Sequence, residues 1–286
     1  MSFENQQKEM IQACEAVFAE KRAELILGYT QGELEGQVVP AFVRPGEAVN
    51  QLIWNPACTL NLAKYTLGRK EKVAIVAKPC DARAIVMYLI EKQLERERVV
   101  LIGMECAGMK KPDGSPAPGC DICTVKLPPL YDLVIKNPEI KDSAPKFQSK
   151  PLDPSEVLGD LSRFKRELEK CLLCFSCRQV CYGCYCNTCF LDRGIPDWGP
   201  ANLELGAKMV FHLGRAMHLA GRCVECGVCE RGCPSGVKIR YLMQDLNQFC
   251  QELYGYQAGL SPDETPALAV FHPNDREVGF LGGALK

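Results

Sequence analysis

Two cysteine runs with the same spacing, 52 residues apart, constrain the chain more than any other feature. They read Cys171-x2-Cys174-x2-Cys177-x3-Cys181 and Cys223-x2-Cys226-x2-Cys229-x3-Cys233, the second followed by Pro234. This is the spacing of the bacterial two-cluster ferredoxin run, in which the fourth cysteine of each run binds the cluster of the other. The chain must therefore fold so that the two runs meet.

Crossed ligation divides the eight thiols into two sets of four. We expect one 4Fe–4S cluster on Cys171, Cys174, Cys177 and Cys233, and a second on Cys223, Cys226, Cys229 and Cys181. A pair of zinc knuckles is the alternative, but zinc sites usually combine two CxxC elements or use histidine. Tyr182 stands where proline follows the second run, so Cys184 could replace Cys181.

Five further cysteines fall outside these sets in the second half of the chain and at its start. Cys184, Cys186 and Cys189 cannot complete a tetrahedral site alone, so they could bind an additional metal with an outside ligand or lie reduced and buried. Cys14 and Cys250 fall in helical patterns and are expected in the core.

The composition limits the classes of partner and compartment. The chain has 286 residues, 47% hydrophobic and 24% charged, which is typical of a soluble globular protein. Its net charge of −1 makes a nucleic-acid partner unexpected. The sequence lacks a signal-peptide pattern and a run of about eighteen apolar residues, which predicts a cytoplasmic protein without direct membrane insertion. Its eighteen cysteines are therefore expected as thiols rather than disulfides.

The first half has the pattern of an α/β fold. A surface helix is predicted over about 5–27, and apolar strands over 72–77 and 98–103. Between the strands, Asp81 is expected to cap a helix over about 82–96. This β-α-β unit predicts parallel strands.

The second half has a different pattern, and the boundary falls in a proline-rich stretch, 137–154. We predict an α/β domain over 1–150 and a mostly helical, ferredoxin-like two-cluster domain with a C-terminal tail over 151–286. Helices are expected to begin near Ser155, to span about 202–220, and to run from 235 or 236 to 253.

Cysteines also follow the two predicted strands of the first half. Cys80 and Cys106 lie at their carboxyl ends, where open α/β sheets place ligands. Cys120 and Cys123 follow as a CxxC pair, so the four thiols could converge on a third 4Fe–4S cluster. Structural zinc on the CxxC pair with scattered core cysteines is the alternative, and Cys58 could substitute as a ligand.

Few other residues suggest chemistry. Lys78, Arg83 and Lys126 could face a flavin or a substrate, although solvated positions are expected for them. No GxGxxG follows a strand, and neither a P-loop nor a Ser-His-Asp order is found, so no catalytic residue is predicted.

Three segments, VAIVAKPCDARAI, RVVLIGMECAGM and GCDICTVKLPPLYDLVI, resemble the beta-subunit family of deazaflavin-reducing hydrogenase and formate dehydrogenase. The resemblance covers about residues 52–136. It implies a 4Fe–4S cluster on Cys80, Cys106, Cys120 and Cys123, and FAD, passing electrons between a hydrogenase or formate dehydrogenase and a deazaflavin. Those beta subunits continue their flavin domain well past the CxxC pair, whereas this chain turns to its second half, so the flavin and deazaflavin pockets could be incomplete.

The segment RAMHLAGRCVECGVCERGCPSGVKIRYLMQDL is similar to cluster-carrying subunits of anaerobic formate dehydrogenase, hydrogenase and heterodisulfide-reductase-type assemblies. Together the resemblances imply an electron-transfer subunit that relays electrons between such a partner and a flavin or deazaflavin site, in a complex with other subunits. Two alternatives remain open. The chain could itself bind FAD and reduce a deazaflavin or NAD(P), or it could be a cysteine-rich structural zinc module.

Overall fold

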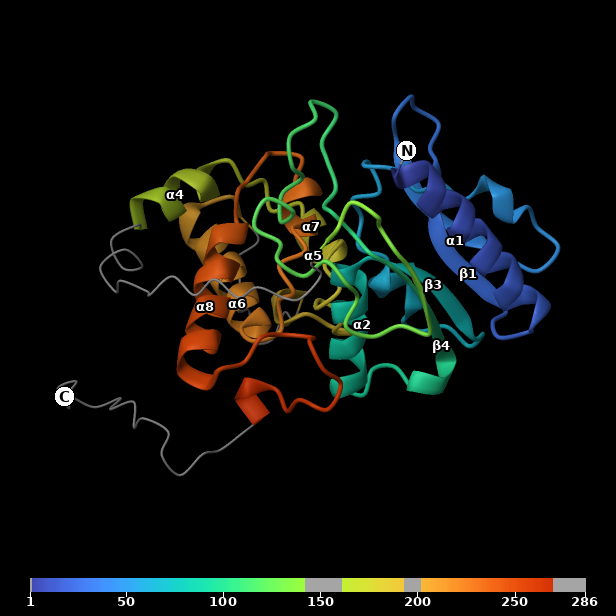
Figure 1. Cartoon of the computed structure of the whole chain (residues 1–286). Coiled ribbons are helices and arrows are strands. Elements are labelled where there is room, and N and C mark those ends of the chain that lie inside the picture. The colour runs from blue at the N-terminus through green and yellow to red at the C-terminus, as the bar shows by residue number, and fades with distance from the viewer. Residues whose placement is uncertain (1, 142–160, 193–201, 270–286) are drawn as a thin grey trace.

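The computed structural model describes residues 2–141, 161–192 and 202–269 (Figure 1). Its first half is a five-stranded sheet in the order β2-β1-β3-β4-β5. Strand β2 runs antiparallel to β1, and the remaining neighbours are parallel. In chain order the elements are α1 (Ser2–Ala19), β1 (Leu25–Gln31), β2 (Val38–Val43), β3 (Val73–Ala77), α2 (Pro79–Ile90), β4 (Val99–Met104) and β5 (Leu133–Ile135).

The two central strands, β3 and β4, are buried along their whole length because helices cover the sheet. Helices α1 and α2 lie on opposite sides of the sheet in Figure 1. Their apolar residues join those of the strands in one hydrophobic cluster. The predicted strands and their parallel pairing are confirmed, with Val73 opposite Val99 and Ala77 opposite Gly103.

Both helices of the first half have bounds that differ from the prediction. The first helix ends at Ala19 rather than near residue 27, because Leu25–Leu27 pair with Val73–Ile75 in the sheet. Helix α2 begins at Pro79, before the predicted start, and ends at Ile90, before the predicted end near residue 96. Asp81 therefore lies in its first turn, where the carboxylate accepts a hydrogen bond from the Lys78 backbone N–H at 2.9 Å.

The described part of the second half is helical. It comprises α4 (Leu161–Glu169), α5 (Ser176–Gln179), α6 (Leu205–Leu219), α7 (Val228–Arg231) and α8 (Arg240–Tyr254). Helix α6 packs against α4 and α8, and α5 packs against α7. The two predicted long helices correspond to α6 and α8. The expected cap at Ser155 and most of the 137–154 stretch lie outside the described residues.

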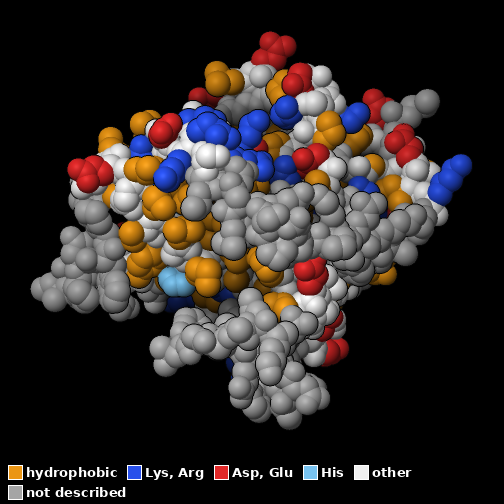
Figure 2. All heavy atoms as spheres, turned by 90° about the vertical axis from the view of Figure 1, so that its left-hand side faces the viewer, with side chains coloured by type: hydrophobic (Ala, Val, Ile, Leu, Met, Phe, Trp, Pro, Cys, Tyr) orange, Lys and Arg blue, Asp and Glu red, His pale blue; other side chains and the backbone are white. Residues whose placement is uncertain are grey.

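Short 3-10 helices complete the described secondary structure: Val49–Gln51, Ala63–Thr66, Arg96–Arg98, Phe190–Asp192 and Ala267–Ala269. Apolar side chains are exposed among charged ones on the face towards which α4, α6 and α8 lie (Figure 2). Of the described helices, none combines the length and apolar character that crossing a bilayer requires.

Helix α2 connects the two halves through buried hydrogen bonds. Arg83 donates to the Ala258 carbonyl at 2.8 and 3.0 Å and to the Val224 carbonyl at 3.2 Å. The Tyr88 hydroxyl donates to the Tyr182 carbonyl at 2.7 Å. The expected solvated positions are wrong for Lys78 and Arg83, which are 2% and 4% exposed, because each is enclosed by residues distant in sequence.

Candidate metal centres

The two cysteine runs have the same backbone conformation. Leu173 and Phe175 have positive φ angles of 49° and 59°, and the equivalent Glu225 and Gly227 have 57° and 71°. In each run the N–H two residues after the first cysteine donates to its sulfur at 3.4 Å. A short helix, α5 or α7, then begins five residues after that first cysteine. The sequence repeat is therefore also a structural repeat, in which the backbone of each run turns back towards the sulfur of its first cysteine.

The first set of thiols lines a cavity between the two runs. The cavity wall contains Cys171, Cys174, Cys177 and Cys233, so the fourth cysteine of the second run lies with the first three of the first run. The Ser176 hydroxyl joins the runs by donating to the Gly232 carbonyl at 2.7 Å. Cys233 also accepts a hydrogen bond from the Val237 N–H at 3.3 Å, and such bonds stabilise a thiolate.

The second set lines a neighbouring cavity, walled by Cys181, Cys223, Cys226 and Cys229. Cys229 also borders the first cavity, so the two sets adjoin. Cys184, the alternative to Cys181, lies beside it, and a hydrogen bond from Cys184 strongly lowers the pKa of the Cys181 thiol. The structure thus places Cys233 with the first run and Cys181 with the second, while the assignment of ligands to each cluster stays a prediction.

Cys80 and Cys106 of the third set lie just after the carboxyl ends of β3 and β4. Cys80 is in the first turn of α2, and Cys106 follows β4. Cys80, Cys120 and Cys123 line one cavity together with Cys226 of the second set. Burial raises the pKa of Cys106 to about 12, and the nearby Cys120 and Cys123 thiols add to this rise.

Burial makes these thiols poor anions without a cation beside them. It raises the pKa of Cys177 to about 11 and that of Cys226 to about 12. A bound metal reverses this preference, because its charge deprotonates a coordinating thiol. Within the described ranges, no three His, Cys, Asp or Glu side chains converge on a point that one ion could fill. The thiols instead line cavities: five border the first, four the second, and the third is bordered by Cys80, Cys120, Cys123 and Cys226 but not by Cys106. Sites made of thiolates alone suit iron–sulfur chemistry.

The second and third sets meet where two loops touch. A Cβ on Gly119 would lie 2.7 Å from the Glu225 carbonyl oxygen, and one on Gly227 would overlap the Pro118 carbonyl. The Arg231 guanidinium donates to the carbonyls of Pro118 and Cys226, so it ties the same loops together. Sequence reasoning missed this contact, because nothing local marks two glycines 108 residues apart as neighbours.

We expect Gly227→Ala to destabilise the contact between these loops. Gly236→Ala is the matched control, because Gly236 also has positive φ, at 63°, but a Cβ there would meet no atom within 4 Å. Backbone strain should cost each variant about 1–2 kcal/mol. Overpacking should cost Gly227→Ala about 1–3 kcal/mol more. Denaturant midpoints compare the two variants, and equal losses would contradict the close approach.

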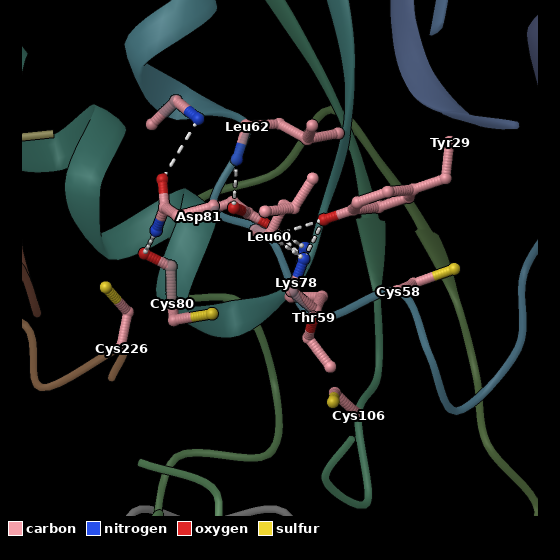
Figure 3. A network of polar contacts seen from close by, with 12 residues as sticks. Tyr29, Cys58, Thr59, Leu60, Leu62, Lys78, Cys80, Asp81, Cys106 and Cys226 are labelled. Carbon is pink, nitrogen blue, oxygen red and sulfur yellow. Dashed lines mark hydrogen bonds and ion pairs between the residues drawn. The ribbon is translucent and has the colours of Figure 1, made fainter. Parts of the chain in front are cut away.

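A buried polar network lies beside the third set (Figure 3). The Lys78 ammonium pairs with Asp81 at 2.8 Å and donates to the Leu60 carbonyl at 2.7 Å and to the Tyr29 hydroxyl. Asp81 also accepts the Leu62 N–H at 2.7 Å. Burial lowers the pKa of Lys78, but Asp81 and Cys80 outweigh it and raise this pKa overall. These groups are thus partnered within the protein.

The remaining cysteines separate into two kinds. Cys184, Cys186 and Cys189 line a larger cavity of about 670 Å³ that Arg178, Arg215 and Arg222 also border. An additional metal there stays a prediction. Cys58 interacts within its own loop, where it accepts the Asn55 N–H at 3.4 Å. Cys14 and Cys250 are buried, as expected for core packing.

Comparison with known proteins finds beta subunits of formate dehydrogenase among the relatives of this chain. The chain is 21% identical to the F420-dependent formate dehydrogenase subunit beta of Methanocaldococcus jannaschii, over 86% of this chain and 89% of the relative. It is 22% identical to the F420-dependent formate dehydrogenase 1 subunit beta of Methanococcus maripaludis, over 69% of this chain and 75% of the relative. No family model matches the chain. The predicted resemblance to such beta subunits is confirmed.

The alignment with the first relative spans 348 positions, more than the 286 residues of this chain. The relative therefore carries segments that this chain lacks.

Proposed function

We propose that this chain is the electron-transfer subunit of a cytoplasmic oxidoreductase complex and carries three 4Fe–4S clusters. The single observation that supports this most strongly is the series of adjoining thiol sets. Cys229 borders both the first and second cavities, and Cys226 borders both the second and third. Adjoining sites of this kind allow an electron to pass from one centre to the next inside a single chain.

In this proposal the cysteine thiolates bind the iron, and the surrounding residues exclude water from the clusters. Bound clusters would each accept and return one electron, with potentials that hydrogen bonds, charge and solvent exposure set. The first set has the exposed Cys174, so we propose this end for electron exchange with a partner subunit. The third set belongs to the α/β half, and we propose that it faces the flavin or deazaflavin side. This half is taken as residues 1–150, and the ferredoxin-like half as 151–286.

The names of the relatives support the kind of complex. Both are beta subunits of formate dehydrogenases described as F420-dependent. We therefore propose a partner subunit of formate dehydrogenase, hydrogenase or heterodisulfide-reductase type, and electron transfer to or from a flavin or deazaflavin. The related candidate, an FAD-bearing chain that reduces a deazaflavin or NAD(P) itself, is favoured by the same two names.

Anaerobic purification with analysis of iron, acid-labile sulfide, zinc and flavin tests the proposal. Three four-iron clusters give about twelve irons and about twelve sulfides per chain. About eight of each would remove the third set from the proposal, and zinc without sulfide would replace it with a structural zinc module. One flavin per chain would favour the FAD-bearing candidate, whereas its absence from the isolated subunit would exclude that candidate.

A further inference from the structure

A buried arginine on α6 lies beside two of the thiol sets. Arg215 is 4% exposed. Its Nη2 donates to the Cys177 carbonyl at 3.2 Å. Its Nε and Nη1 atoms are also buried, and neither has an acceptor with hydrogen-bond geometry in the described part of the chain. The guanidinium nevertheless interacts with the Cys181 and Cys184 thiols and favours their charged forms, so the buried cation faces sulfur atoms.

The thiols around Arg215 indicate which anion can compensate its buried charge. When ionised, the thiols that act most strongly on its guanidinium are Cys181 and Cys229 of the second set, followed by Cys184 and Cys177. Arg215 also forms part of the wall of the second cavity. Burying a cation is unfavourable unless an anion compensates it. Four thiolates around iron and sulfide would supply that negative charge.

Helix α6 places a different side chain beside each of the two ferredoxin-type sets. His212 lies one turn before Arg215, and its Nε2 is 3.3 Å from the Cys171 sulfur of the first set. One face of helix α6 therefore places an imidazole beside the first set and a guanidinium beside the second.

A fixed charge has a predictable effect on a redox centre. Reduction adds one negative charge to a cluster, and a nearby cation in a low-dielectric interior stabilises the reduced form more than the oxidised form. The effect decreases with distance, so it is largest for the set whose cavity Arg215 borders.

We propose that Arg215 makes the cluster held by Cys181, Cys223, Cys226 and Cys229 easier to reduce. In a series of three centres, this places the electron preferentially on the middle one. The inference rests on the proposed function, since it requires that cluster. Arg215 acts through its charge and holds no iron itself.

The test is a redox titration of the full chain, purified without oxygen and followed by electron paramagnetic resonance. Arg215→Gln should lower the ratio of reduced to oxidised middle cluster at least tenfold at a given potential, which is about 59 mV for one electron. Arg215→Lys keeps the charge on a shorter side chain, so its ratio should fall only about threefold. Arg166→Gln is the matched control, because it removes the same charge from an exposed position on α4 where solvent screens it.

The outcomes separate this inference from the proposed function. A wild-type chain without acid-labile sulfide would defeat the proposed function. Wild type and Arg215→Gln with equal iron and equal midpoint potentials would overturn only the role of Arg215, as would equal shifts in the Lys and Gln variants. If Arg215→Gln loses iron, the second neutral variant Arg215→Met replaces it, and a ratio equal to that of wild type in Arg215→Met would overturn the role.

Discussion

Cys233→Ala is expected to remove the cluster of the first cysteine run, although Cys233 itself belongs to the second. The reason is geometric, since Cys233 shares a cavity with Cys171, Cys174 and Cys177. Alanine provides no ligand, and a four-iron cluster needs four. Iron should therefore fall from about twelve to about eight per chain, which elemental analysis measures.

Electron paramagnetic resonance spectra identify which cluster is lost. We expect Cys233→Ala to lose the same signal as Cys171→Ala, and a different signal from Cys223→Ala. Cys250→Ala serves as the control, because this buried thiol borders none of the three cavities and should keep all its iron. Loss of the Cys223→Ala signal in Cys233→Ala would mean that each run binds its own cluster.

Lys78→Met is expected to produce the largest loss of stability. The change leaves Asp81, which is 0% exposed, as a buried carboxylate without its cation. Removing one partner of a buried ion pair costs about 3–5 kcal/mol of unfolding free energy. Lys111→Met is the matched control, since its pair with Asp113 is exposed and 3.5 Å long, and should change stability by less than about 0.5 kcal/mol.

The pH dependence of the Lys78→Met deficit follows from the sign of the pKa shift. The pKa of Lys78 is raised above its ordinary 10.5 in the folded chain. Its stabilising contribution is therefore fully present below pH 10.5 and is lost as the pH rises through the folded-state pKa. Denaturant unfolding at pH 7 and pH 9 should give the same deficit. A deficit under about 1 kcal/mol would contradict the role of the ion pair.

Local patterns predicted the parts of the fold that depend on neighbouring residues. The strands 73–77 and 99–104 contain short apolar runs, and the cysteine spacings predicted that Cys233 lies with the first run and Cys181 with the second. Strand β1 was missed because LILGYTQ is apolar at positions that also suit a helix, and its parallel partner β3 begins 48 residues later. Strands β2 and β5 were missed as well, since their pairing depends on the sheet already present.

The burial of charged residues was also beyond local reasoning. Arg83 lies in an ordinary helical pattern, yet its partners Val224 and Ala258 are 141 and 175 residues away. The helical pattern predicts an exposed position for Arg215, and only the tertiary structure shows the thiols that surround it. Such positions combine an unfavourable burial with a compensating group that only the tertiary structure supplies.

Helix α2 also determines how this chain can be shortened or recombined. One hydrophobic cluster contains the sheet, α2, and Tyr182, Val224 and Tyr256 from beyond residue 161. A fragment ending at residue 141 would expose this apolar surface and leave the Arg83 guanidinium without its carbonyl partners. Neither half can therefore be exchanged for a homologous domain without changing the contacts between the two halves. A homologous ferredoxin-type segment grafted in place of the second half would have to bring its own acceptors for Arg83.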